Sequence, residues 1–79
     1  MDKSELLEYL DQYESANSDD VARALNVTYS VAAMALLRLV RQDLVTRYKH
    51  PEHHVYVYEL TPKGEARLAY LLETEFDDD

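Results

Sequence analysis

Hydrophobic residues recur at helical spacing in the first part of the chain. Within 4–14, the apolar residues Leu6, Leu10 and Tyr13 fall at i, i+4 and i+7. Leu7 lies beside them, and acidic residues occupy the remaining side of the helical pattern. This spacing predicts an amphipathic helix with an acidic outer face.

A second, shorter helix is predicted from the signals at its two ends. Ser18 is suited to cap it, and Asp19 and Asp20 in the first turn favour the positive end of the helix dipole. We expect the helix to run to Leu25. Asn26 follows where a left-handed residue would end it.

The third predicted helix, over 29–42, is the most apolar part of the chain. Val27 is expected to pack inward, and Thr28 is suited to cap this helix. Only a few residues separate it from the helix before, so the two helices should be joined by a tight turn.

Two strands and a last helix are predicted in the remaining chain. The segments 44–48 and 55–60 are rich in β-branched and aromatic residues, and Pro51 lies in the turn between them, which predicts a hairpin. Thr61 then offers a cap and Pro62 suits the first helical position of the fourth helix. The apolar positions of these elements predict a core that contains Leu6, Leu10, Val21, Leu25, Val27, Leu36, Leu39, Leu44 and Leu60.

The length and composition favour one small cytoplasmic domain. Seventy-nine residues leave no room for a second core, so we expect a single domain over 1–79 with a frayed acidic tail at 77–79. The chain has no cysteine, which excludes a disulfide framework and a thiolate metal site. No apolar run approaches the roughly 20 residues of a membrane span, and the first residues are unlike a signal peptide.

The order of these elements is that of a winged helix. Segment 20–28 resembles the entry into the helix-turn-helix of bacterial and archaeal winged helix-turn-helix regulators. Segment 60–68, Leu-Thr-Pro-Lys-Gly-Glu-Ala-Arg-Leu, is similar to the stretch that enters the last helix in MarR-like and PadR-like members. The resemblance implies an α+β, mainly α fold with three helices, a two-stranded wing and a C-terminal helix. Asp43 departs from the family, in which a glycine commonly precedes the wing.

The resemblance also implies a function, because in DNA-binding members the third helix lies in the major groove and the wing contacts the backbone. It identifies the chain as a duplex DNA-binding transcriptional regulator. The outward positions carried over to this chain are Thr28, Tyr29, Ser30, Val31, Ala33, Met34, Leu37, Arg38 and Arg41, with Arg47 and Lys49 on the wing.

Several of these outward positions are apolar, which leaves alternatives open. Base edges are usually read by Arg, Lys, Asn or Gln, whereas an apolar side chain contacts only the thymine methyl. Met34 and Leu37 therefore fit a protein partner as well as DNA, and a rotated helix would bury them instead. The basic residues near the end of this helix have an alternative role as well, because positive side chains at a helix C-terminus interact favourably with the helix dipole.

Charge is distributed unevenly along the chain. The net charge is −8, which opposes an approach to phosphate and favours a protein-binding module or adaptation to a salt-rich cytoplasm. Segment 21–56, however, contains five basic and two acidic residues and so carries +3, against −11 for the remainder. A fold that gathers this segment on one side would have one positive face.

The three histidines of the predicted hairpin tip, His50, His53 and His54, do not suggest a metal site. Their spacing matches no zinc signature, so we expect no metal. Imidazole gains charge below about pH 6.5, which would make the wing more positive. The sequence also contains no phosphate-binding glycine loop and no catalytic constellation, so neither enzymatic activity nor a cofactor is expected.

The fourth predicted helix has more apolar residues than one face needs to cover a small core. This excess predicts a homodimer, since DNA-binding dimers match the two-fold symmetry of their sites. The predicted interface residues are Leu68, Leu71, Leu72 and Phe76.

Overall fold

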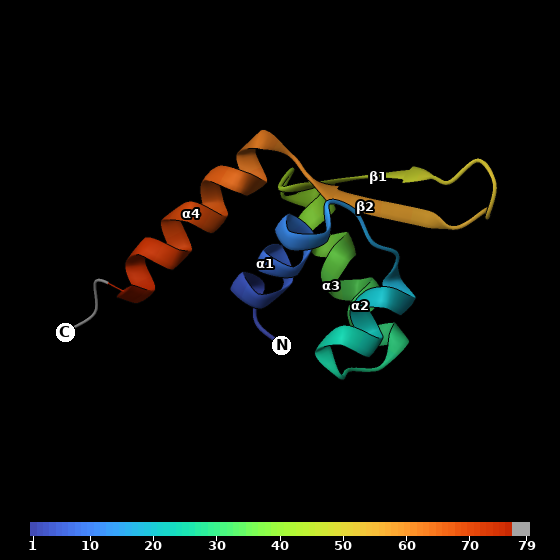
Figure 1. Cartoon of the computed structure of the whole chain (residues 1–79), viewed down its shortest axis with the longest axis horizontal. Helices are drawn as coiled ribbons and strands as arrows, with labels where there is room; N and C mark the ends of the chain where they lie inside the picture. The colour runs from blue at the N-terminus through green and yellow to red at the C-terminus, as the bar shows by residue number, and fades with distance from the viewer. Residues whose placement is uncertain (77–79) are drawn as a thin grey trace.

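The chain adopts the predicted order of three helices, a hairpin and a last helix (Figure 1). The computed structural model describes residues 1–76, with side chains to residue 73, so the predicted acidic tail lies outside the described residues. The mainly α, winged-helix architecture is confirmed. The elements are α1 (Lys3–Tyr13), α2 (Ser18–Leu25), α3 (Tyr29–Arg41), β1 (Val45–Lys49), β2 (Tyr56–Leu60) and α4 (Pro62–Phe76).

Helix α1 begins at a capping box. The Asp2 carboxylate accepts a hydrogen bond from the Glu5 N–H at 3.0 Å, and the Glu5 carboxylate accepts one from the Asp2 N–H at 3.2 Å. The helix buries Leu6, Leu7 and Leu10. Tyr13, predicted on the apolar side, is instead 55% exposed; it lies on the last turn of the helix, with its ring centre 4.7 Å from that of Tyr9.

Helices α2 and α3 form the predicted helix-turn-helix. The prediction that Ser18 caps α2 is wrong: Asn17 is the cap, and it exchanges two hydrogen bonds with Asp20, at 2.7 and 3.1 Å. Asn26 ends α2 in the predicted left-handed conformation, with φ 57°. The chain turns by 115° between the two helices, within the range of a helix-turn-helix.

The hairpin forms close to the predicted segments, and a third segment that the sequence did not predict pairs with it. Strands β1 and β2 are antiparallel, from Val45 opposite Leu60 to Lys49 opposite Tyr56. Ala16, predicted to lie in a polar break, donates to the Tyr58 carbonyl at 3.0 Å and accepts from its N–H at 2.8 Å. These bonds join the connection between α1 and α2 to the base of the wing.

The junction of the wing with its neighbouring helices is tightly packed. Asp43, at the position where the family commonly has glycine, itself adopts a positive φ of 63°. Thr61 caps α4 as predicted, accepting from the Gly64 N–H at 2.9 Å. A side chain at Gly64 would collide with the Leu44 carbonyl, so the only glycine of the chain permits this close approach of α4 to the residue that precedes β1.

The core lies where α1, α2, α3 and the base of the wing meet. Most predicted core residues are buried, and Leu25, Val27 and Leu60 are half-buried against them. The predicted core did not include Ala16, Ala32 and Leu68, which are also buried. Leu68 is 5% exposed, so it is a core residue and has almost no surface left for the predicted dimer interface.

The molecule is elongated, with extents of 46 × 26 × 20 Å. Helix α4 and the wing extend in opposite directions from the three central helices (Figure 1). Within residues 1–76, no single helix is long and apolar enough to cross a membrane, and α2 and α3 reach that length and apolarity only as a bent pair.

Candidate nucleic-acid interface

Helix α3 turns most of its predicted contact residues to solvent. Its buried face is made of Ala32, Leu36 and Leu39, which fixes the rotation of the helix. Of the two apolar residues that a rotated helix would bury, Met34 is exposed and Leu37 is half-buried. Thr28, Tyr29, Ser30, Val31, Met34, Arg38 and Arg41 are exposed, and Ala33 and Leu37 are half-buried.

The first half of α3 presents an apolar surface. Thr28 caps the helix by accepting from the Val31 N–H at 3.2 Å. Beyond it, Tyr29 is 62%, Met34 49% and Val31 48% exposed. Large apolar side chains this accessible on one helix are typical of a surface that meets a partner.

A groove separates α3 from the wing. It has a volume of about 300 Å³ and is lined on the α3 side by Tyr29 and Ala33 and on the wing side by Tyr56 and Tyr58. Asn17 and the first residues of α2, Ser18 and Asp19, also line it. We call this the α3–wing groove; it is bounded in part by the two elements that contact DNA in winged-helix domains.

The wing places its basic residues on the side of the α3–wing groove. Arg47 lies opposite Tyr58 and Lys49 opposite Tyr56 in the strand register, so all four side chains leave the same face of the sheet. The Arg47 guanidinium carbon lies 4.3 Å from the centre of the Tyr56 ring. The predicted basic residues of the wing thus flank the groove.

The other two predicted basic residues, Arg38 and Arg41, lie three positions apart in the last turns of α3. The sequence did not predict that Lys3 lies near Arg38. Its Nζ donates to the Gln42 side chain at 2.7 Å, and Lys3 and Arg38 line the same hollow of about 190 Å³. No local signal identifies Lys3, because the contact joins residues 39 positions apart.

The fifth basic residue of the positive segment does not add to this surface. Arg23 forms ion pairs with Asp19 at 3.0 Å and with Asp20 at 3.4 Å, both within α2. Among the described residues, no ion pair involves Arg38, Arg41, Arg47 or Lys49. Four of the five charges therefore remain available to an anionic partner.

The histidines form the tip of the wing. The Nδ1 atom of His50 accepts from the N–H groups of Glu52 at 3.1 Å and His53 at 3.4 Å, and the His50 and His53 rings lie 4.6 Å apart. His54 has a positive φ of 55°. One nitrogen of His50 is thus used to shape the turn. Within 1–73, no three His, Cys, Asp or Glu side chains gather in a way suited to a metal ion.

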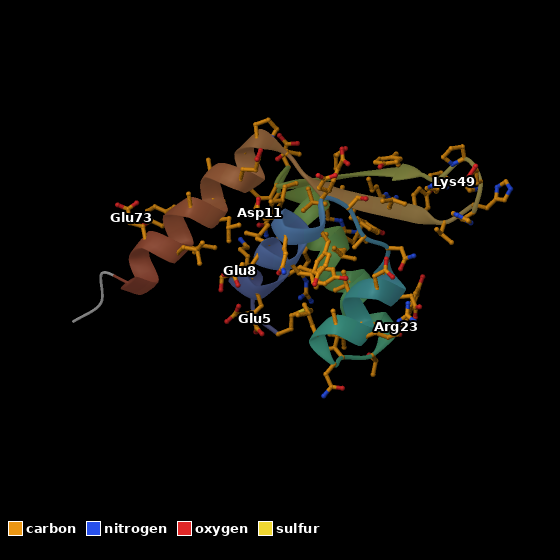
Figure 2. The ribbon with its side chains drawn as sticks, viewed as in Figure 1. Glu5, Glu8, Asp11, Arg23, Lys49 and Glu73 are labelled. Carbon is orange, nitrogen blue, oxygen red and sulfur yellow. The ribbon has the colours of Figure 1, made fainter. Side chains whose placement is uncertain are left out.

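Acidic residues lie both near this surface and far from it. Asp19 lines the α3–wing groove. Figure 2 shows Glu73 on α4 toward the end of the molecule opposite the wing, the labelled acidic residues of α1 between them, and Lys49 near the far end of the wing. The fold therefore separates Glu73 from the basic residues of the wing.

Solved structures with the same fold include a MarR family transcription regulator. The chain is similar to a MarR family transcription regulator, with 28% identity, 92% of this chain and 49% of that chain covered, and a TM-score of 0.85. It is also similar to wild-type MarR from E. coli, with 20% identity, 95% and 56% coverage and a TM-score of 0.89. The YusO protein from Bacillus subtilis matches at 22% identity, 86% and 49% coverage and a TM-score of 0.83.

These similarities support the MarR-like resemblance and the winged-helix fold. The chain spans about half the length of the solved structures that it matches. No protein-family model matches the sequence, and no curated protein sequence does so either.

Proposed function

We propose that this chain, with the fold of MarR-family transcription regulators, is a duplex DNA-binding domain of a cytoplasmic regulator. The main support for the proposal is that the exposed helix α3 and the basic side chains of the wing flank the same groove. In this arrangement α3 enters the major groove and the wing contacts the neighbouring backbone. The proposal requires no cofactor, no metal and no enzymatic activity.

Affinity in this proposal comes mainly from phosphate contacts. Arg38, Arg41, Arg47 and Lys49 are exposed and form no ion pair within the described residues. Phosphate contacts position a protein on the duplex without reading its sequence. The apolar residues Val31 and Met34 add contacts to thymine methyl groups, so we expect modest sequence preference.

A titration of the intact protein into labelled duplex DNA at low salt tests the proposal. Arg38→Ala with Arg41→Ala should weaken binding at least tenfold, because two charge-assisted phosphate contacts are lost. Arg23→Ala is the matched control, since Arg23 is already paired with Asp19 and Asp20. A folded protein that binds no duplex would contradict the proposal.

A protein-binding winged helix is the second candidate function, and the exposed apolar residues of α3 favour it. Met34 and Val31 are each about half exposed, 49% and 48%, which suits an apolar hot spot better than a base-reading surface. In that case Met34→Ala and Leu37→Ala would abolish binding to the partner, whereas the arginine variants would mainly alter association rates.

We further propose that the domain works as a homodimer through α4. Leu68 is buried and contributes little to such an interface, and the Phe76 side chain lies outside the described residues. Leu71 and Leu72 are half-buried and retain apolar surface on α4. Leu71→Glu with Leu72→Glu should give a folded monomer in sedimentation. An unmodified protein that is monomeric at high micromolar concentration would exclude the dimer.

A further inference from the structure

Arg47 and Tyr56 form a cation–π pair on the wing. The Arg47 guanidinium carbon is 4.3 Å from the centre of the Tyr56 ring. The two residues are diagonal neighbours, because Arg47 is opposite Tyr58 and Lys49 is opposite Tyr56. Tyr56 is 48% exposed, so burial in the core does not explain its position.

The surroundings of Tyr56 connect this pair to the candidate interface. Tyr56 lines the α3–wing groove, with Tyr29 of α3 among the other lining residues. A guanidinium that stacks on the Tyr56 ring is therefore held beside the groove instead of moving freely over the wing. Stacking on an aromatic face leaves the N–H groups at the edge of the guanidinium free to donate to phosphate.

We propose that Tyr56 is a positioning residue that fixes the Arg47 side chain for a DNA backbone phosphate. This inference rests on the proposed function. An arginine side chain loses rotational freedom when it binds, and a ring that restricts it beforehand reduces that loss. Tyr56 acts through Arg47, so its removal should weaken DNA binding only while Arg47 is present.

A double-mutant cycle on the intact protein tests the proposal, with a labelled DNA duplex as the probe. Tyr56→Leu should weaken binding about two- to fivefold, the range expected for an exposed cation–π contact. Tyr56→Phe keeps the ring and should bind like the unmodified protein. In the Arg47→Ala background, Tyr56→Leu should cause no further loss.

Tyr48→Leu is the matched control. Tyr48 is 44% exposed in the same hairpin, but it lies opposite Val57 and so leaves the other face of the sheet. Its replacement should not alter DNA binding. A loss equal to that of Tyr56→Leu would show that the hairpin as a whole has been disturbed and would overturn the positioning role.

A measurement without DNA examines the pair itself. The Tyr56 ring current should shift the Arg47 side-chain protons in NMR spectra, and Tyr56→Leu should abolish that shift. An unchanged Arg47 spectrum overturns the inference, as does equal weakening by Tyr56→Leu with and without Arg47. If the unmodified protein binds no duplex, the proposed function fails and the inference fails with it; if it binds and the cycle shows no coupling, only the inference fails.

Discussion

The α3–wing side and the α1–α4 side of this molecule differ in how their charges are used. On the α3–wing side, Arg38, Arg41, Arg47 and Lys49 have no acidic partner in the described part of the chain. The α1–α4 side presents exposed carboxylates such as Glu8. The net charge of −8 therefore describes the whole chain but not the surface offered to a partner.

The dimensions of the molecule separate the far end of α4 from the wing. The long axis is 46 Å, whereas charges in 0.15 M salt are screened over about 8 Å. Carboxylates at the α4 end thus have little effect on a phosphate bound near the wing. Acidity should slow the approach to DNA at low salt and matter less once a complex has formed.

The largest expected effect is on the stability of the whole domain, because both sides pack on one core. Leu36 is fully buried on the inner face of α3. Leu36→Ala should lower the free energy of unfolding by about 2–5 kcal/mol, since it removes apolar contacts and leaves a cavity. Chemical denaturation measures this change. A cost below about 1 kcal/mol would mean that α3 faces the other way.

Replacement of Gly64, the only glycine of the chain, should destabilise the packing between α4 and the start of the wing. Gly64→Ala would bring a Cβ against the Leu44 carbonyl, so α4 or the residue that precedes β1 must shift. We expect a loss of about 1–3 kcal/mol in unfolding free energy, typical of overpacking. Lys63→Ala, at the exposed neighbouring position, is the control and should change stability little. Equal stability of the two variants would contradict the close approach of α4 to Leu44.

Within the helix-turn-helix, stability should depend on the cap of α2. Asn17→Ala removes the side chain that accepts from the Asp20 N–H and should cost about 0.5–2 kcal/mol. Ser18→Ala should cost less, because Ser18 does not cap the helix. Thermal unfolding of both variants shows which substitution lowers stability more. A larger loss for Ser18→Ala would mean that Ser18 caps the helix, as the sequence predicted.

The smallest effect concerns the cap of α1 and its dependence on pH. The backbone N–H of Glu5, with further help from the Ser4 hydroxyl, lowers the pKa of the Asp2 carboxyl from its ordinary value. Because the pKa of Asp2 is lowered in the folded state, the cap stabilises the fold fully at pH values above the ordinary carboxyl pKa. This stabilisation is lost as the pH falls through the pKa of Asp2 in the folded state. NMR titration of Asp2 should show this lower pKa, and Glu5→Ala should leave most of the shift, because the backbone donor remains. A pKa at or above the ordinary value would contradict the cap.

The sequence predicted the elements of this fold well because each has its own local signal. The helical spacing of Leu6 and Leu10, the left-handed Asn26 and the Thr61 cap all depend on residues near them in the chain. What it missed depends on distant partners. Ala16 pairs with Tyr58, and Leu68 is buried by helices and strands that precede it.

The exposed face of α3 was predictable from the sequence, but the pairing of its charges was not. The resemblance selected the exposed face of α3, and the rotation of that helix agrees. The charge count of segment 21–56 included Arg23. Its partners Asp19 and Asp20 lie just before that segment, within one helical turn of Arg23. Lys3 was not selected, because only the folded chain brings it beside Gln42.

The most direct test of the account is the salt dependence of duplex binding. Four phosphate contacts predict a slope of about −3.6 per subunit in a plot of log affinity against log salt. Removal of Arg38, Arg41, Arg47 or Lys49 should each reduce the magnitude by about 0.9, whereas Arg23→Ala should leave it unchanged. A slope that Arg23→Ala alters as much as the others, or no duplex binding by the folded protein at low salt, would contradict the claim that α3 and the wing form a DNA-binding surface.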